Sequence, residues 1–368
     1  MSRNNGTEDG PDRRVFLGGL AATTAAAVVF AAPGTAYANA ASHPLGWFDV
    51  KEYGAVGNNV TDDTVAIQNC IDAAAAAGGG FIYFRAGIYL VGGALKSGSN
   101  SQLTLPAIHY VDGKQLTLVF CGATPPPPVY SVIGSTPVPD GHSIIRSTLT
   151  AGSGGSLLAG WGPTGSFANF TNVMLRMENI TLRMPTNPTH TAANLSKVAA
   201  VDLNNVSVDT GSYYVQGLAE PTTSTSFGVR LPGNDNGAYT RVDAVNVFGF
   251  YTGFEIGEHT VGRQMTAWAC KRVLAVPFGY HASKIERLMG VHCQVGIVFT
   301  GEHYLDVDQF NIEHAGNGWW ATTADVDDLS NLGHGLIRWH VVKAGIGVDR
   351  TFTKRGGTGL TIIEIGYD

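Results

Sequence analysis

The chain has 368 residues, of which 44% are hydrophobic and only 14% charged, with 48 glycines and a formal net charge of −6. This composition is typical of a turn-rich β protein, and it excludes a coiled coil, a helical bundle and a disordered chain. The negative charge argues against nucleic acid or an anionic membrane as the main partner, because both favour basic surfaces.

Residues 1–40 have the pattern of an export signal. Arg13 and Arg14 precede an apolar, alanine-rich run over residues 20–32, and a small-x-small cleavage site follows at residues 36–40. The order is that of a secretory signal, and the Arg-Arg-x-Phe-Leu core resembles the bacterial twin-arginine type. We therefore expect a signal peptide at residues 1–40, secretion by the twin-arginine route and no membrane association after cleavage.

Residues 48–91 carry the most informative pattern. A short apolar segment ends in a turn at Gly54, and the adjacent acids Asp62 and Asp63 then mark a helix start, where carboxylates suit the helix dipole. Apolar residues at helical spacing predict a helix over residues 64–77, which three glycines end before two short strands. Two adjacent carboxylates also suit catalysis or calcium binding, but capping accounts for them here.

This segment, FDVKEYGAVGNNVTDDTVAIQNCIDAAAAAGGGFIYFRAGIYLV, resembles the N-terminal cap of right-handed parallel β-helices of the pectate-lyase superfamily. That superfamily is related to family 28 glycosidases, and phage tailspikes begin in the same way. One departure is Arg85, where the family often has proline. The resemblance implies an all-β fold, a single-stranded right-handed parallel β-helix with an N-terminal capping helix. It implies no particular reaction, because catalytic groups differ among members.

The C-terminal half shows the period of such a solenoid. The segment 253–259 reappears at 275–281 and again at 296–302, and the segment 242–247 recurs at 307–312. A period of roughly 22 residues predicts stacked coils, each of which buries its apolar face against its neighbours. We expect one β-helix domain over residues 41–368, with the cap at 41–95 and coils with loop insertions at 96–368.

Three stretches lack the coil pattern and are expected to be loops: residues 124–165, 185–197 and 216–240. Proline runs cannot continue a hydrogen-bonded ladder, and insertions of this kind often build a binding groove on one face of a solenoid. Cys270 and Cys293 lie about one coil apart, so we expect neighbouring thiols, either bridged or free. A homotrimer, frequent in the superfamily that the sequence resembles, would cover the exposed end of the solenoid.

Stacking converts the sequence period into columns of side chains. The repeated segments predict one column with Asp243, Met265, Glu286 or Arg287, and Asp308, and a second with Phe248, Cys270, Val291 or His292, and Glu313. Neighbouring strands lie about 4.8 Å apart, so carboxylates on adjacent coils reach the separation that glycosidases use. The candidate catalytic residues are Asp308, Glu313, Glu286, Arg287, Asp306, His314 and Asp243.

Two mechanisms fit these residues. A hydrolase would use two acids, such as Asp308 and Glu313, with Glu286 in reserve. A lyase acting on a uronic-acid polymer would use Arg287, Lys284 or a histidine as base, together with an arginine or calcium that neutralises the substrate carboxylate. No other cofactor is expected. The same acids also suit a structural ladder that stabilises the solenoid.

Aromatic side chains offer faces on which sugar rings stack. The candidate substrate-binding residues are Trp319, Trp320 and Trp268, with His292 beside the acidic cluster, although core packing also accounts for such aromatics.

Three histidines, His259, His281 and His303, are expected at one corner of successive coils. Neutral imidazoles suit zinc or copper. An exposed column of turn residues is the more frequent arrangement, so no metal is assigned.

We therefore expect a secreted carbohydrate-active enzyme, a glycoside hydrolase or polysaccharide lyase, that cleaves a polysaccharide bound along the β-helix. One alternative is an intramolecular glycosyl or fructosyl transferase that releases a cyclic product. The other is a non-catalytic glycan-binding module of the tailspike or adhesin type. A polysaccharide or oligosaccharide is the expected partner, and the identity of the sugar stays open.

Overall fold

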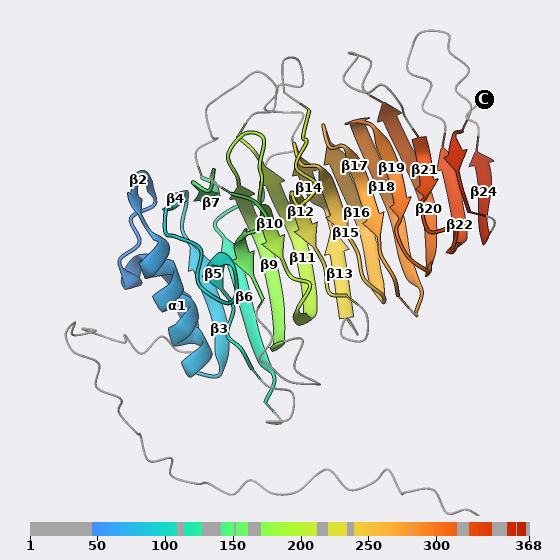
Figure 1. Cartoon of the computed structure of the whole chain (residues 1–368). Coiled ribbons are helices and arrows are strands. Elements are labelled where there is room, and N and C mark those ends of the chain that lie inside the picture. The colour runs from blue at the N-terminus through green and yellow to red at the C-terminus, as the bar shows by residue number, and fades with distance from the viewer. Residues whose placement is uncertain are drawn as a thin grey trace, which may run out of the picture. The chain divides into compact units, whose positions relative to one another are not determined.

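A computed structural model describes residues 46–108, 114–126, 141–150, 152–160, 171–211, 220–233, 239–279, 281–314, 324–340, 352–357 and 359–365. Within these ranges the named strands pair in parallel and stack coil upon coil, so the predicted all-β parallel β-helix is confirmed. Figure 1 shows the coils following one another from β3 to β24. The expected signal peptide lies outside the described residues and stays a prediction.

Two sheets form the described coils, and the first has 15 strands. Its main path runs through β1 (Trp47–Asp49), β3 (Gly79–Phe84), β6 (Leu116–Gly122), β9 (Thr171–Arg183), β11 (Val198–Asp209), β13 (Tyr239–Asp243), β16 (Thr260–Trp268), β18 (Ser283–Cys293), β20 (His303–His314), β22 (Gly333–His340) and β24 (Gly359–Ile365). Beside this path lie β2 (Asn58–Asp62), β4 (Gly87–Val91), β7 (Ser143–Ser147) and β14 (Val245–Phe248).

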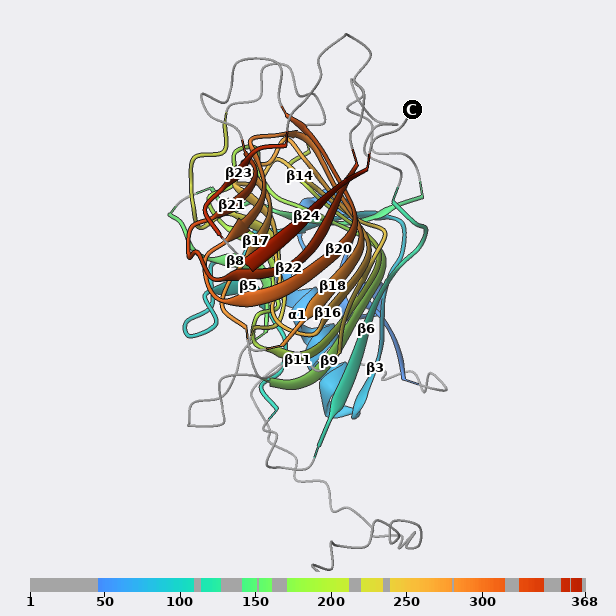
Figure 2. The same cartoon turned by 90° about the vertical axis from the view of Figure 1, so that its right-hand side faces the viewer.

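The second sheet has nine strands within the described residues. They are β5 (Ser101–Thr104), β8 (Ser156–Ala159), β10 (Thr191–Asn194), β12 (Phe227–Arg230), β15 (Thr252–Glu255), β17 (Arg272–Val276), β19 (Val295–Phe299), β21 (Ala324–Asp328) and β23 (Lys354–Arg355). Figure 2 shows the strands of successive coils nested behind one another.

A large hydrophobic core runs through the described coils, with a small separate cluster at Val295, Val298 and Ala324. Along β20, Leu305 and Val307 are buried, whereas Asp306 and Asp308 are half-buried on the opposite face. This alternation is the period of two that a strand imposes on its side chains. The outer faces of the strands are therefore left to polar residues, and any binding site on the coils lies there.

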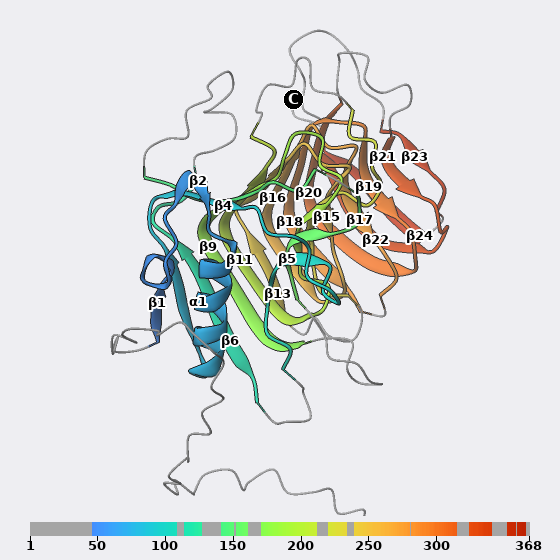
Figure 3. The same ribbon diagram turned by 60° about the vertical axis from the view of Figure 1, so that its left-hand side comes forward.

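The capping helix is confirmed as α1 (Thr64–Ala76), with the 3-10 helix η1 (Val50–Tyr53) beside it. Figure 3 shows α1 against the first coils, where its buried residues Ile67, Cys70 and Ile71 join the core. No helix in the described ranges combines the length and the apolarity that a membrane crossing requires.

The two acids at the helix start have structural roles, as predicted. The Asp62 carboxylate accepts a hydrogen bond from the Thr64 backbone N–H at 3.0 Å, and that of Asp63 accepts from Val56 N–H at 2.7 Å and Gly57 N–H at 3.0 Å. Although burial acts to raise it, hydrogen bonds from Thr64 and Gly92 hold the pKa of Asp62 below its usual value. The N-cap residue is Asp63, whose side chain makes no capping hydrogen bond and instead fastens the preceding turn to the helix. Asp62 accepts from the N–H of the first helical residue.

A column of left-handed residues bends the long strands of the first sheet. Asn179, Asn205 and Ala244 have φ of 57°, 52° and 53°, and their flanking residues pair across β9, β11 and β13. Asparagine tolerates this conformation because its side chain bonds locally to the backbone, whereas alanine has no such compensation.

Replacing Ala244 by glycine should therefore raise the free energy of unfolding by about 1 kcal/mol, because glycine enters the left-handed region without a Cβ clash. Urea denaturation measures the change. The control is Ala275→Gly in β17, where φ is not positive and glycine should destabilise by about 0.5–1 kcal/mol. Equal effects at both positions would contradict the account of the bend.

The offset between individual coils differs from the prediction. In the first sheet Val242 pairs with Gly262, Gly262 with Ile285 and Ile285 with Val307, so the first step is shorter than predicted and the second is longer. The match between segments 242–247 and 307–312 is confirmed, since Val242 and Val307 share a column. Register follows the inward-facing residues and the turn lengths, not the resemblance between turn sequences.

The expectation of three long loops was wrong in part. Strands β7 and β8 lie within residues 124–165, β10 lies within 185–197, and β12 lies within 216–240. Three of these short strands contain Ala, Asn or Gly, which have weak strand preference. Hydrogen bonds to coils on both sides hold them extended, because tertiary context overrides β propensity.

Cys270 and Cys293 are both buried and free. Burial raises the pKa of Cys270 to about 12 and holds that of Cys293 well above its usual value. Thiols in such surroundings are unreactive, so both act as core residues.

Candidate functional site

The predicted acidic cluster forms a ladder of ion pairs on the outer face of the first sheet. Arg263 lies 2.8 Å from Asp243 and 3.7 Å from Glu286. Asp308 lies 2.9 Å from Lys284 and 2.8 Å from Arg338. The pairings on either side place Asp243, Arg263, Glu286, Asp308 and Arg338 in one column.

Arg263 therefore occupies the place predicted for Met265, which pairs instead with Val245 and Leu288 in the core. Two other candidate catalytic residues, Arg287 and Asp306, also have hydrogen-bond partners. Arg287 Nε donates to Gln309 Oε1 at 3.1 Å, and Asp306 Oδ1 accepts from Leu336 N–H at 3.0 Å. Opposite charges meet at three of the four steps of this column, which is the arrangement of a stabilising ladder. At the remaining step the acids Glu286 and Asp308 are neighbours on β18 and β20, as predicted.

The second predicted column is corrected in the same way. Phe248 pairs with Trp268, Trp268 with Val291 and Val291 with Glu313, so Trp268 and not Cys270 lies in this column. Trp268 is half-buried. Glu313 lies beyond Asp308 on β20, about 16 Å along an extended strand. That exceeds the spacing of paired glycosidase carboxylates.

His292 lies at a corner of the coil with φ of 53°, and its Nε2 is 3.8 Å from Glu313 Oε1. The backbone of His314 pairs with Cys293 at the end of β20. Trp319 and Trp320 lie outside the described residues. The assignment of catalytic and substrate-binding roles to these residues stays a prediction.

The ladder itself yields a prediction that separates structure from catalysis. Asp308→Asn should change the free energy of unfolding by no more than about 1 kcal/mol, because exposed ion pairs contribute little. If the ladder is structural, the substitution should change glycan turnover by no more than about twofold. Such a change corresponds to less than about 1 kcal/mol in the activation free energy. A loss of turnover of three orders of magnitude would restore Asp308 as the catalytic acid.

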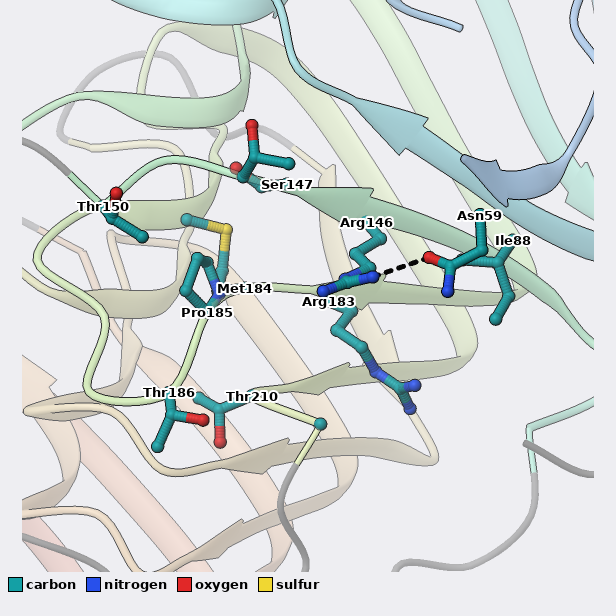
Figure 4. Close-up of a pocket in the computed structure, with 12 residues that line it drawn as sticks. Asn59, Ile88, Arg146, Ser147, Thr150, Arg183, Met184, Pro185, Thr186 and Thr210 are labelled. Carbon is teal, nitrogen blue, oxygen red and sulfur yellow. Dashed lines mark hydrogen bonds between the residues drawn. The ribbon is translucent and has the colours of Figure 1, made fainter. Parts of the chain in front are cut away.

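A cleft of about 750 Å³ lies elsewhere on the solenoid, beside the ends of β4, β7, β9 and β11 (Figure 4). Its lining includes two arginines, a group of hydroxyl side chains and three apolar residues. The described lining residues are Asn59, Ile88, Arg146, Ser147, Thr148, Thr150, Arg183, Met184, Pro185, Thr186, Thr210 and Gly211.

The two arginines are direct neighbours. Arg146 on β7 pairs with Arg183 on β9, and Arg183 pairs with Asp209 on β11. Adjacent strands lie about 4.8 Å apart, so the two arginine side chains leave the backbone at neighbouring positions. Figure 4 shows Asn59 beside the Arg146 guanidinium, with a hydrogen bond of 2.7 Å from Arg146 Nη1 to Asn59 Oδ1.

The local charge balance is positive. Arg183 makes a two-point contact with the fully buried Asp209, with Nε to Oδ1 at 2.6 Å and Nη2 to Oδ2 at 3.1 Å. Among the described residues Arg146 has no carboxylate within ion-pair distance. Asp209 therefore balances one of two cations, and Arg146 remains to attract an anion from solvent.

The rest of the lining suits a sugar. Thr148, Thr150 and Thr186 are exposed and supply hydroxyl donors and acceptors. Ile88 and Pro185 are half-buried and present apolar surface for the C–H face of a ring. Two fixed cations, several hydroxyls and apolar walls together match an anionic carbohydrate.

The family described as "Rhamnogalacturonase A/epimerase, pectate lyase-like" matches residues 47–276, which is more than half of the chain. The chain belongs to this family. The match includes all the described residues that line the cleft, and it confirms the pectate-lyase-like resemblance of the N-terminal cap.

Shorter similarities link the chain to curated proteins. It is 48% identical over 66 residues to mannuronan C5-epimerase AlgE3 of Azotobacter vinelandii, which is 18% of this chain and 4% of the relative. It is 44% identical over 66 residues to alginate lyase 7 of the same organism, and the match covers 18% of this chain and 8% of the relative. It is 60% identical over 43 residues to plasmin and fibronectin-binding protein A of Streptococcus pneumoniae, and the match covers 11% of this chain and 6% of the relative. The chain thus covers less than a tenth of each of these relatives.

Solved structures with low identity are similar to the chain. ORF18 of Geobacillus virus E2 has 14% identity and a TM-score of 0.41, with 87% of this chain and 61% of that chain covered. The A-module of Azotobacter vinelandii mannuronan C-5 epimerase AlgE6 has 15% identity and a TM-score of 0.29, with 87% and 99% covered.

Sequence reasoning missed the cleft. Arg146 lies in a stretch that was expected to be a loop, and Arg183 ends a strand whose neighbours do not follow the regular coil period. The usable signal was Ile144-Ile145-Arg146-Ser147, a short apolar strand ending in a cation, beside a second strand that ends in Arg183.

Proposed function

We propose that the protein is a carbohydrate-active enzyme that acts on a uronate-containing polysaccharide, with Arg146 and Arg183 binding the uronate carboxylate in the cleft. The observation that carries the proposal is the pair of adjacent arginines, of which a single buried carboxylate on β11 balances only one. A guanidinium group forms planar, two-point hydrogen bonds with a carboxylate, which gives both affinity and orientation.

The chemistry that follows is abstraction of the proton at C5, next to the carboxylate. Removing this proton places negative charge on the carboxylate, and two fixed guanidinium groups stabilise that charge. Return of a proton to the opposite face gives an epimer, and loss of the group at C4 gives an unsaturated lyase product. The names of two relatives, a mannuronan C5-epimerase and an alginate lyase, specify polymers of uronic acids and support this substrate class. Export is part of the proposal, because such polymers lie outside the cell.

A specific observation favours one alternative, a non-catalytic module that binds the same glycan. Among the described residues that line the cleft, none is a histidine, lysine, tyrosine or free carboxylate that would take the C5 proton.

Incubation of the full chain with polymannuronate, homogalacturonan and a neutral glucan in heavy water tests both. Deuterium at C5, seen by NMR, or ultraviolet absorbance of unsaturated ends shows the enzyme. Binding of a uronate polymer without exchange or cleavage shows the glycan-binding module. Absence of binding and turnover with every uronate polymer would overturn the proposal.

A further inference from the structure

Glu258, His259 and His281 come together at one corner of the solenoid, away from the cleft. Glu258 and His259 lie in the turn between β15 and β16, and His281 precedes β18 on the next coil. One ligand atom from each residue lies within 4.8 Å of the other two. His281 Nδ1 contacts a Glu258 carboxylate oxygen, and the rings of His259 and His281 stack with centroids 4.5 Å apart.

The turn that carries two of these residues is held firmly. The carbonyl oxygen of Gly257 accepts hydrogen bonds from Thr260 Oγ1 at 3.0 Å and Ser283 Oγ at 2.9 Å. A Cβ atom at Gly257 would lie 1.6 Å from the carbonyl oxygen of Pro232, so only glycine fits there. His259 adopts φ of 57°. Because the backbone is fixed from both coils, little reorganisation is needed to bring the side chains onto one ligand.

Of the three histidines predicted at this corner, His259 and His281 lie together, whereas His303 does not join them. His303 is buried behind the corner, with Nδ1 3.2 Å from the carbonyl oxygen of Pro277 and Nε2 3.2 Å from Ser283 Oγ. It supports Ser283 from inside. A fully buried Glu258 takes its place beside the two exposed histidines.

We propose that Glu258, His259 and His281 bind a divalent transition-metal ion of the zinc class, with the remaining coordination positions open to solvent. Two imidazoles and one carboxylate are a donor set that zinc favours, whereas calcium prefers oxygen donors throughout. Donors around tetrahedral zinc lie about 3.4 Å apart, and rotation of the two exposed imidazoles closes the remaining distance. The buried carboxylate supplies negative charge beneath the ion, and the metal joins two successive coils.

Equilibrium dialysis of the full chain, prepared without a histidine tag, against zinc chloride tests the site. We expect one zinc per chain. His259→Ala and His281→Ala should each weaken zinc binding at least about tenfold, because loss of even an outer-shell partner has an effect of this size. Cobalt bound in place of zinc should give a visible absorption spectrum that both variants lose.

His334→Ala is the matched control, because His334 is an exposed strand residue on β22, on another part of the solenoid. It should bind zinc like the unmodified chain. Glu258→Gln extends the test to the carboxylate, and the two histidine variants decide the outcome even if Glu258→Gln does not fold. Failure of the unmodified chain to bind zinc, or unchanged binding in both histidine variants, would overturn the proposal. Neither result depends on glycan binding.

Discussion

Replacing Arg146 by glutamate should weaken binding of polymannuronate oligomers by about tenfold to a hundredfold, the equivalent of one charge-assisted hydrogen bond. Arg146 has no acidic partner among the described residues, so its charge is available to the ligand. Glutamate removes this cation and places a carboxylate where the uronate carboxylate binds, which adds repulsion between like charges. Titration calorimetry at fixed ionic strength measures the change, and the difference should shrink as salt is added.

Arg176→Glu is the matched control for this variant. Arg176 lies on β9, the strand that carries Arg183, but it lies outside the cleft and its side chain is 44% exposed. The same change of charge on the same strand should alter binding less than about twofold, a small fraction of one such hydrogen bond. Arg146→Lys should retain part of the affinity, because lysine keeps the charge and loses the planar two-point contact. Equal losses at positions 146 and 176 would show that net charge alone drives binding.

Replacing Arg183 by alanine should lower the free energy of unfolding by about 3–5 kcal/mol. Its partner Asp209 is fully buried, and truncation of Arg183 leaves that carboxylate without its cation inside the protein. Asp209 keeps the hydrogen bond from the Gly211 N–H at 2.8 Å, but removing one partner of a buried ion pair is strongly destabilising. Urea denaturation followed by circular dichroism measures the difference.

Arg263→Ala provides the contrast, because Arg263 also pairs with an aspartate at 2.8 Å but is 60% exposed. Its loss should lower the free energy of unfolding by less than about 1 kcal/mol, since exposed ion pairs contribute little. Equal losses in the free energy of unfolding of the two variants would show that burial of Asp209 does not strengthen its ion pair with Arg183. Asp209→Asn in the Arg183→Ala background should recover part of the loss, because it removes the buried negative charge.

The fold was largely predictable, for identifiable reasons. The helix start at Asp62 and Asp63, the three glycines after the helix and the following strand form a local pattern that nearby residues determine. The overall match between Val242 and Val307 was also visible, because inward-facing residues repeat in every coil. The separate steps through Gly262 and Ile285 were not visible, because turn lengths vary without a sequence marker.

The candidate site was less predictable, since it depends on register. Because the first step is shorter than predicted, Arg263 takes the place of Met265 and lies between the acids Asp243 and Glu286. Glu286 and Asp308 remain neighbours, as predicted. The cleft escaped because β7 is short and follows a proline-rich stretch. Its pairing with β9, which brings Arg146 beside Arg183, depends on neighbouring coils and not on the strand preference of Ser143–Ser147.

The central claim is that the cleft recognises the carboxylate of a uronate. The most direct measurement compares the binding of a mannuronate oligomer with that of the same oligomer after its carboxyl groups have been reduced to alcohols. Both ligands have the same length and ring stereochemistry, so the comparison isolates the carboxylate. The unmodified chain should bind the acidic oligomer at least about tenfold more tightly, and Arg146→Glu should abolish this preference. Equal affinity for the two oligomers would contradict the claim.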